Sequence, residues 1–188
     1  MLLIIVLGLV GNIATIFNLF QKEHRRKTIT GLMINLASAN FLICICGYPI
    51  AVSAVGKETS LLNQNRALCG WIAFSSACCG FAAIFSLTFM SVQTYRGVTR
   101  LRLKGKASSS STKTSFFLIA LVWILSFVIA APPFFGWNRF VPMETGGSCQ
   151  PDWLSQSVKD ILYLAFLVCG GFFIPLCVIF YSNFMIYR

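Results

Sequence analysis

The stretch that decides the fold is residues 123–153, which read WILSFVIAAPPFFGWNRFVPMETGGSCQPDW. It begins as an apolar segment and reaches two consecutive prolines, Pro132 and Pro133. A proline has no backbone N–H to donate, and it pushes the residue before it toward extended geometry, so a helix cannot continue through this pair. Gly136-Trp137 then opens a polar loop, and tryptophan favours the boundary between membrane and water. The stretch therefore predicts a helix that ends at a membrane surface.

The composition of the 188 residues independently indicates a membrane protein. Hydrophobic residues make up 57% of the chain, charged residues only 11%, and the mean hydropathy is +0.78, far from the charge-rich surface of a soluble domain. A bilayer core of about 30 Å needs about 20 helical residues. Five segments meet this length, and we expect each to cross the membrane: 1–20, 32–55, 71–92, 115–135 and 161–187. Basic residues follow the first segment instead of preceding it, which is not the pattern of a signal peptide.

The net charge of +10 is distributed unevenly between the loops. Basic residues crowd the first and third loops between the expected spans: Lys22, Arg25, Arg26, Lys27, Arg96, Arg100, Arg102, Lys104, Lys106 and Lys113. The opposite side holds four of the five acids: Glu58, Glu144, Asp152 and Asp160. Cytosolic loops carry the excess of Lys and Arg in membrane proteins, so we expect an extracellular N-terminus. The basic residues suit anionic lipid headgroups, and no nucleic-acid partner is expected.

The search for catalytic chemistry gives negative results. Proton pumps, membrane proteases and ion-coupled transporters need ionisable side chains inside the bilayer, and none of the five expected spans has a central Asp, Glu, His, Lys or Arg. The lone histidine, His24, lies in a loop, and the cysteines show no metal-binding spacing. Neither an enzyme nor a metal site is expected. The polar residues within the spans are expected to hydrogen-bond between helices: Asn12, Asn35, Ser38, Asn40, Ser76, Ser86 and Ser126.

Several motifs of the chain resemble the opsins, within the rhodopsin-like G-protein-coupled receptors. Residues 123–153 match the fourth helix and second extracellular loop of that family through Trp123, Pro132-Pro133, Gly136-Trp137, Cys149 and Asp152-Trp153. Further matches are Gly11-Asn12, Leu36-Ala37-Ser38-Ala39-Asn40, Gly47-Tyr48-Pro49 and Pro175. The resemblance implies an all-α fold, an integral membrane helical bundle in which residues 1–188 supply five transmembrane helices of a seven-helix receptor.

Two of the eight cysteines lie at or beyond the extracellular ends of the spans, Cys69 and Cys149. The other six lie within spans, where cysteine commonly serves as a small apolar packing residue. A Cys69–Cys149 disulfide is therefore expected in an oxidising compartment, and it matches the bond that joins helix three to the second extracellular loop in the family. Two free cysteines are the alternative.

The resemblance also implies a ligand pocket. Opsins bind retinal as a protonated Schiff base to a lysine on helix seven, whereas every lysine of this chain lies in a loop or at the end of a span: Lys22, Lys27, Lys57, Lys104, Lys106, Lys113 and Lys159. The usual counterion positions fall on Ile72 and Met143, so Glu144 is the possible counterion. Ser76 replaces the acid that amine receptors carry. The pocket would be lined by Ser76, Ala77, Gly80, Phe81, Ser148, Gln150, Trp153, Leu167, Gly171 and Phe172; core packing is the alternative role for these residues.

The resemblance places a degenerate G-protein switch at Gln93-Thr94-Tyr95. In similar receptors this triplet is acidic-Arg-Tyr, and its Arg reaches the G protein on activation. Arg96 lies two residues after Thr94, and at about 100° per residue it faces another side of the helix. Asn183 stands where the family often has a tyrosine, and Asn40 removes the charge of the sodium site. Conventional activation of a G protein is therefore not implied.

These observations favour a light-sensing, retinal-binding receptor of the plasma membrane, present as a chain without helices six and seven. One alternative is an orphan or opsin-derived receptor for a non-covalent apolar ligand. A second is a truncated membrane interaction protein that pairs with another receptor chain. The expected partners are the lipid bilayer and, for a signalling receptor, a heterotrimeric G protein. A helix-seven lysine beyond Arg188 would separate the photoreceptor from the alternatives.

Overall fold

The protein was analysed as a computed structural model, which describes residues 2–21, 28–46, 65–104, 112–143 and 148–188. The helices are α1 (Leu2–Leu19), α2 (Thr28–Cys46), α5 (Arg66–Lys104), α6 (Thr112–Ala130), α7 (Val158–Val168) and α8 (Ile174–Tyr187). A 3₁₀ turn, η1 (Pro132–Phe135), follows α6, and a π-helical turn, η2 (Cys169–Phe173), joins α7 to α8. Strands β1 (Phe140–Pro142) and β2 (Cys149–Pro151) pair antiparallel, with Val141 opposite Gln150.

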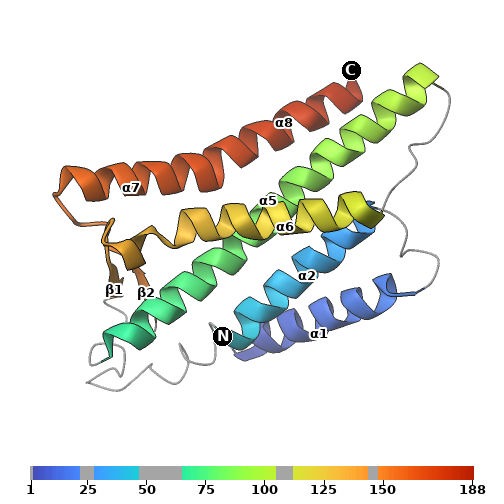
Figure 1. The fold of residues 1–188 in the computed structure, drawn as a ribbon. Coiled ribbons are helices and arrows are strands. Elements are labelled where there is room, and N and C mark those ends of the chain that lie inside the picture. Colours follow the sequence, from blue (N-terminus) through green and yellow to red (C-terminus); the bar gives the residue numbers. More distant parts are fainter. Residues whose placement is uncertain (1, 22–27, 47–64, 105–111, 144–147) are drawn as a thin grey trace.

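The helices form a bundle that α5 crosses diagonally (Figure 1). On one side of α5 lie α1 and α2, and on the other lie α7 and α8; α6 packs against α2, α5 and α7. The 39 residues of α5 give a length of about 58 Å at 1.5 Å per residue, about twice the bilayer core. The end of α5 that carries Arg96, Arg100 and Arg102 therefore extends beyond the apolar region.

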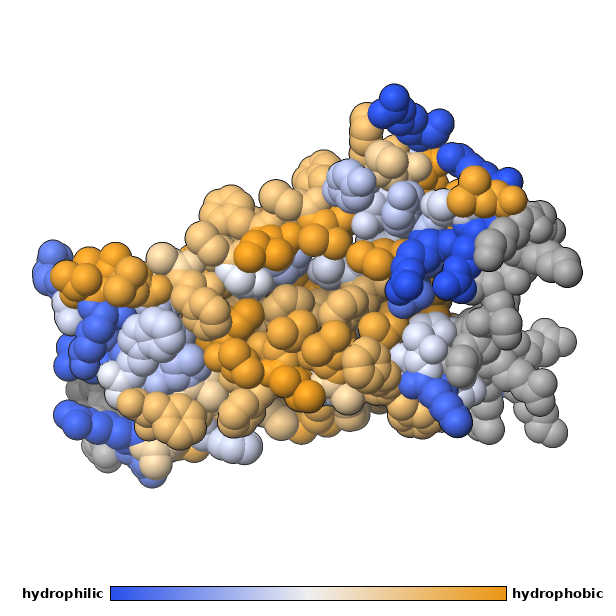
Figure 2. All heavy atoms as spheres, turned by 45° about the horizontal axis from the view of Figure 1, so that its top comes forward, coloured by the Kyte–Doolittle hydropathy of each residue, from blue (hydrophilic) through white to orange (hydrophobic). Residues whose placement is uncertain are grey.

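Four helical stretches are long and apolar enough to cross a membrane: Thr28–Cys46, Arg66–Leu103, Thr112–Ala130 and Val158–Tyr187. The first helix, α1, is also apolar but shorter. Figure 2 shows hydrophobic side chains along the middle of the molecule and hydrophilic ones at both ends. The chain is thus a multi-pass helical membrane protein, while the division into five spans stays a prediction, and part of the expected 32–55 span lies outside the described residues.

The core lies where α2, α5 and α6 meet. Its buried apolar residues are Leu32, Ala39, Ala82, Phe85, Leu118, Val122 and Ile129. A polar contact joins the same three helices: Trp123 Nε1 donates to Asn35 Oδ1 at 2.9 Å, and Asn35 Nδ2 donates to Ser86 Oγ at 2.9 Å. Water is absent from a bilayer core, so polar groups must be satisfied within the protein. The expected hydrogen bonds between helices are present for Asn35 and Ser86.

Other polar side chains of the spans are satisfied within their own helix. Ser38 Oγ donates to Ile34 O at 2.8 Å, and Ser126 Oγ donates to Val122 O at 2.7 Å. Asn12 Nδ2 likewise donates to Gly8 O at 2.7 Å. A hydroxyl or amide that bonds one turn back needs no neighbouring helix. The expectation of contacts between helices is therefore wrong for these three residues.

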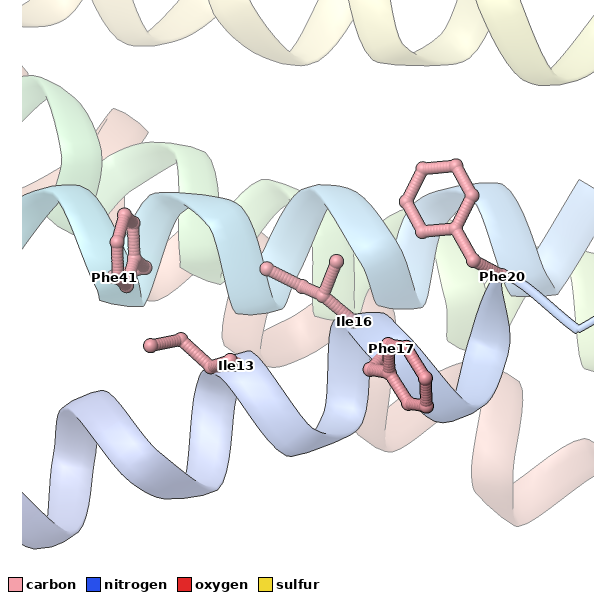
Figure 3. A pocket seen from close by; sticks show the side chains of 5 residues that line it. All are labelled: Ile13, Ile16, Phe17, Phe20 and Phe41. Atoms are coloured by element: carbon pink, nitrogen blue, oxygen red, sulfur yellow. The ribbon is translucent and has the colours of Figure 1, made fainter.

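An apolar groove of about 280 Å³ runs between α1 and α2. Figure 3 shows its lining, which consists of Ile13, Ile16, Phe17, Phe20 and Phe41. The α1 residues recur at the spacing of one helix face. None of them belongs to the ligand pocket that the sequence predicts, so this groove is separate from that site.

Candidate ligand-binding site

The predicted pocket residues of α5 lie on a half-buried surface below the β-hairpin. Ser76, Ala77, Gly80 and Phe81 are all of intermediate exposure. A methyl group built at Gly80 would meet no atom within 4 Å, apart from its own helix. The α5 surface therefore has open space beside Gly80, where a ligand could lie without displacing a side chain.

The opposite wall comes from η2, where Gly171 is buried against the ring of Phe81. A Cβ at Gly171 would overlap the Phe81 ring, with Cδ1 at 2.9 Å and Cζ at 3.0 Å. Real Cβ atoms do not approach aromatic carbons so closely, so any larger residue at position 171 would require the Phe81 ring to move. Leu167 of α7, one turn earlier, packs against the same core cluster as Phe81. The structure therefore brings α5 and η2 together through Phe81 and Gly171.

The hairpin is held over the N-terminal end of α5 by the Cys69–Cys149 disulfide, which confirms the expected bond. The two Cα atoms are 5.5 Å apart, and both cysteines are buried with Ile72 and Ala73. Ile72 is 1% exposed. The residue at the helix-three counterion position is therefore part of an apolar cluster.

Aromatic rings fill the space between the hairpin and the helices. The Phe74 ring meets Phe127 of α6 and Phe134 of η1 at centroid distances of 5.7 and 5.2 Å, and Phe134 meets Phe140 of β1 at 5.5 Å. These edge-to-face contacts are the geometry that aromatic pairs prefer. The prolines that end α6 thus turn the chain so that η1 supports the hairpin from below.

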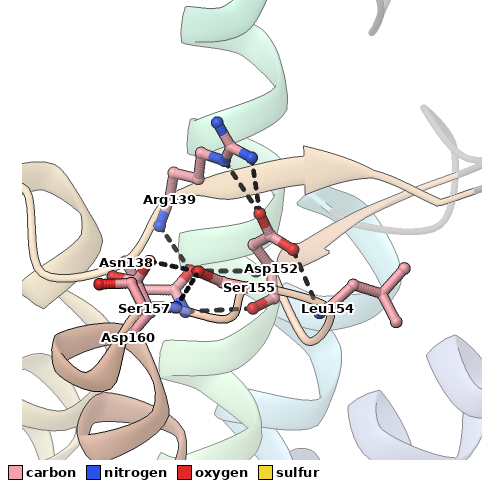
Figure 4. A network of polar contacts seen from close by, with 7 residues as sticks. All are labelled: Asn138, Arg139, Asp152, Leu154, Ser155, Ser157 and Asp160. Atoms are coloured by element: carbon pink, nitrogen blue, oxygen red, sulfur yellow. Dashed lines mark hydrogen bonds and ion pairs between the residues drawn. The ribbon is translucent and has the colours of Figure 1, made fainter.

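A polar network closes the base of the hairpin (Figure 4). Asn138 Nδ2 donates to Asp152 O at 3.2 Å, and Asp152 N–H donates to Asn138 Oδ1 at 3.0 Å. Arg139 Nε donates to Asp152 Oδ2 at 2.9 Å, and a second guanidinium nitrogen lies 2.9 Å from the same oxygen. Asn138 and Asp152 are buried, whereas the Arg139 side chain is 77% exposed. The buried amide pairing, more than the solvent-screened ion pair, fixes the two ends of the loop.

The other predicted pocket residues lie farther from this wall or on the surface. Ser148 and Gln150 lie on the β2 side of the hairpin and are partly buried. Trp153 is 47% exposed and Phe172 is 51% exposed. Met143 is also exposed, and Glu144, the possible counterion, lies outside the described residues. That these residues line the ligand pocket stays a prediction.

At the opposite end of α5, Thr94 Oγ1 donates to Met90 O at 2.9 Å and is exposed. Gln93 and Tyr95 are half-buried, and Arg96 is exposed. Arg102 donates through a guanidinium nitrogen to Ile186 O of α8 at 2.8 Å. This hydrogen bond to the end of α8 is therefore made by Arg102, eight residues beyond Thr94.

Two residues that position the site were missed by the sequence analysis. Trp137 Nε1 donates to Lys159 O at 2.6 Å, so the tryptophan expected at the interface also binds α7. Tyr163, fully buried, donates its hydroxyl to Ile129 O at 3.2 Å. For the bond of Tyr163 the sequence held a usable signal in Pro133. This proline has no N–H to give to the carbonyl four residues earlier, which is that of Ile129, so that carbonyl needs another donor.

The comparison with protein families decides the classification. Residues 11–188 match the family described as the 7 transmembrane receptor (rhodopsin family). The chain belongs to this rhodopsin family of receptors. The expected class of receptor fold is thus confirmed, and the family consists of receptors and not of enzymes.

Similar members of the rhodopsin family are named rhodopsin and melanopsin. The chain is 32% identical to "Rhodopsin" of Lacunicambarus ludovicianus over 182 residues, which is 96% of this chain and 58% of that protein. It is 29% identical to "Melanopsin" of Homo sapiens over 188 residues, all of this chain and 38% of that protein. The crystal structure of squid rhodopsin matches the fold with a TM-score of 0.88 at 24% identity, covering 97% of this chain and 51% of that one.

The chain therefore spans about three-fifths of the length of the first relative, and less of the other two. The fold and the family rest on this shared part. The match to the family covers residues 11–188, and the match to the squid structure covers 97% of the chain.

Proposed function

We propose that the chain is the ligand-binding part of an opsin-like photoreceptor and that its ligand is retinal. The observation that carries the proposal is the open α5 surface at Gly80, which lies along α5 after the disulfide-bonded Cys69 and directly before Phe81, the partner of Gly171. An elongated apolar ligand suits a wall of this kind, in which few polar groups interrupt apolar side chains. The names of the relatives, rhodopsin and melanopsin, support the choice of retinal.

Filling the space beside Gly80 tests this proposal. Purified chain in lipid nanodiscs is titrated with 11-cis-retinal, and binding is followed by quenching of tryptophan fluorescence. We expect saturable binding and a roughly tenfold or greater loss of affinity in Gly80→Leu, since overpacking costs about 1–3 kcal/mol and about 1.4 kcal/mol is tenfold.

Gly97→Leu is the matched control. Gly97 lies on the same helix, also with no atom within 4 Å of a built Cβ, but 17 residues away, about 25 Å along the axis. The control should bind retinal like the unaltered chain. Equal losses in the two variants, or no binding by the unaltered chain, would count against the retinal site.

The orientation in the plasma membrane is part of the proposal. Exposed cationic side chains gather at the end of the bundle that holds Arg96, Arg102 and Lys113, and the excess of basic residues marks the cytosolic side. We expect a cysteine label at position 113 to react only after cells are permeabilised. A label at the exposed Leu154 should react in intact cells, and the reverse pattern would contradict an extracellular N-terminus.

A heterotrimeric G protein is the proposed partner at that end, but without the usual switch. Thr94 carries no charge, and its hydroxyl already binds Met90 O. We expect the chain in nanodiscs, with retinal and light, to leave nucleotide exchange on the G protein at the rate seen with empty nanodiscs. Exchange above that rate would show that residues other than Gln93-Thr94-Tyr95 suffice for activation. Pairing with another receptor chain is the alternative partner.

A further inference from the structure

The segment between α6 and the hairpin holds the first turns of α7. Trp137 lies between Gly136 and Asn138, which have φ angles of 81° and 72°. This left-handed region favours glycine and is tolerated by asparagine. The left-handed residues on both sides of Trp137 turn the chain sharply. The Trp137 ring packs against the rings of Tyr163 and Phe166 of α7, with a centroid distance of 5.9 Å to each.

Two hydrogen bonds in opposite directions join this segment to Lys159 of α7. Trp137 Nε1 donates to the Lys159 carbonyl at 2.6 Å, and Lys159 Nζ donates back to the Gly136 carbonyl at 3.3 Å. The Trp137 ring is also nearly parallel to that of Phe166, at 14°. The loop thus touches α7 at positions 159, 163 and 166, which spans two turns of the helix.

A third bond ties α7 to α6 at a place that the prolines create. In an uninterrupted helix the Ile129 carbonyl would accept from the N–H of residue 133, but Pro133 has none. The Tyr163 hydroxyl donates to Ile129 O instead, at 3.2 Å, and Tyr163 is fully buried. The hydrogen bond to the Ile129 carbonyl therefore fixes the position of α7 along its own axis as well as its direction.

These contacts lie on the same continuous helical stretch as the pocket wall. Gly171 follows Lys159 by 12 residues, about 18 Å along a helix, and Gly170 sits beside Ile129, whose Cδ1 is 3.5 Å from a built Cβ. The Phe81–Gly171 contact has no room for a methyl group. The position of α7 and η2 therefore sets how closely Gly171 lies to the Phe81 ring.

We propose that Trp137, Lys159 and Tyr163 form an α7 clamp, a set of positioning residues that holds Gly171 against Phe81 and so sets the width of the ligand pocket. The role as a pocket wall rests on the proposed function. The geometric claim, that the clamp fixes the distance between α5 and η2, is independent of the proposed function.

The distance between α5 and the helix after η2 tests the clamp directly. Spin labels are placed on the exposed Leu87 and Ile174 in the whole chain, with the six free cysteines replaced by alanine, and the distance is measured by pulsed electron resonance. We expect Trp137→Ala to shift or broaden the distance by about 1–2 Å, the size of the helix shifts seen at subunit interfaces in switching proteins. Retinal affinity is measured in parallel.

Leu154→Ala is the matched control, because Leu154 is an apolar residue of the same loop that is 83% exposed and is not one of the predicted pocket residues. It should leave the distance unchanged. Tyr163→Phe and Lys159→Ala should shift the distance less than Trp137→Ala, and Lys159→Gln, which keeps a donor, should restore it. These milder variants decide the question if Trp137→Ala does not fold.

An unchanged distance in Trp137→Ala, Tyr163→Phe and Lys159→Ala would overturn the clamp. This holds even if all three variants melt at a lower temperature, because a loss of stability without a change of distance means that the three residues only stabilise the fold. A chain that binds no retinal but shows the expected shifts would overturn the proposed function and leave the clamp intact. Shifts that are equal in Trp137→Ala and Leu154→Ala would also overturn the clamp.

Discussion

Replacing both Cys69 and Cys149 by alanine is expected to lower the free energy of unfolding by about 2–5 kcal/mol. The disulfide joins residues 80 apart in sequence, so its loss frees a long loop in the unfolded chain, and the entropy gained there grows with loop length. It also releases β2 from the buried cluster around Ile72. Alanine is chosen because a serine hydroxyl at these buried positions would add an unsatisfied polar group.

Reversible unfolding in mixed micelles would give the free energy, and hydrogen exchange of the amides of residues 139–143 and 148–152 would locate the loss. The double variant Cys169→Ala and Cys177→Ala, which removes two exposed free thiols, is the control and should unfold like the unaltered chain. If both double variants lose the same free energy, the loss reflects the removal of any two cysteines and not of the bond.

The chain mixed with 11-cis-retinal is expected to form no covalent pigment. A Schiff base needs an unprotonated amine that reaches the ligand. Lys113 and Lys159 are exposed in the first turns of α6 and α7, and Lys159 donates to Gly136 O. Lys104 is the last residue of α5, and the remaining lysines lie outside the described residues. None of the three described lysines lies within the apolar length of a helix.

Borohydride reduction followed by mass spectrometry would detect an adduct, and absorption spectra would detect a visible band. Ser76→Lys provides the positive control, because it places an amine on the half-buried α5 surface one turn from Gly80. We expect an adduct in this variant alone. A visible band from the unaltered chain would show that one of its own lysines reaches the ligand.

Sequence reasoning succeeded where local chemistry decides the structure. The two prolines predicted that a helix stops at them, and α6 ends at Ala130, just before them and five residues before the end of the expected 115–135 span. The position of Cys69 and Cys149 outside the apolar segments predicted the disulfide, and the family motifs predicted the receptor fold.

The remainder depends on contacts distant in sequence. The third span was expected over 71–92, but α5 continues to Lys104, because hydropathy does not detect helical residues that leave the apolar region. The π-helical turn at 169–173 and the three-residue strands carry no periodic signal of their own length. The contact of Trp137 with Lys159 depends on how α6 and α7 pack, and 22 residues separate the pair.

The bond between Tyr163 and Ile129 has a consequence for the order in which the protein is made. Residue 163 leaves the ribosome 34 residues after residue 129, a delay of about 2–7 s at the usual rate of synthesis. During that interval α6 exists with a carbonyl that Pro133 cannot satisfy. Its outer end must then stay in contact with water or lipid headgroups, because an unpaired carbonyl is costly in hydrocarbon. The arrival of α7 removes this restriction, because the Tyr163 hydroxyl then donates to the Ile129 carbonyl.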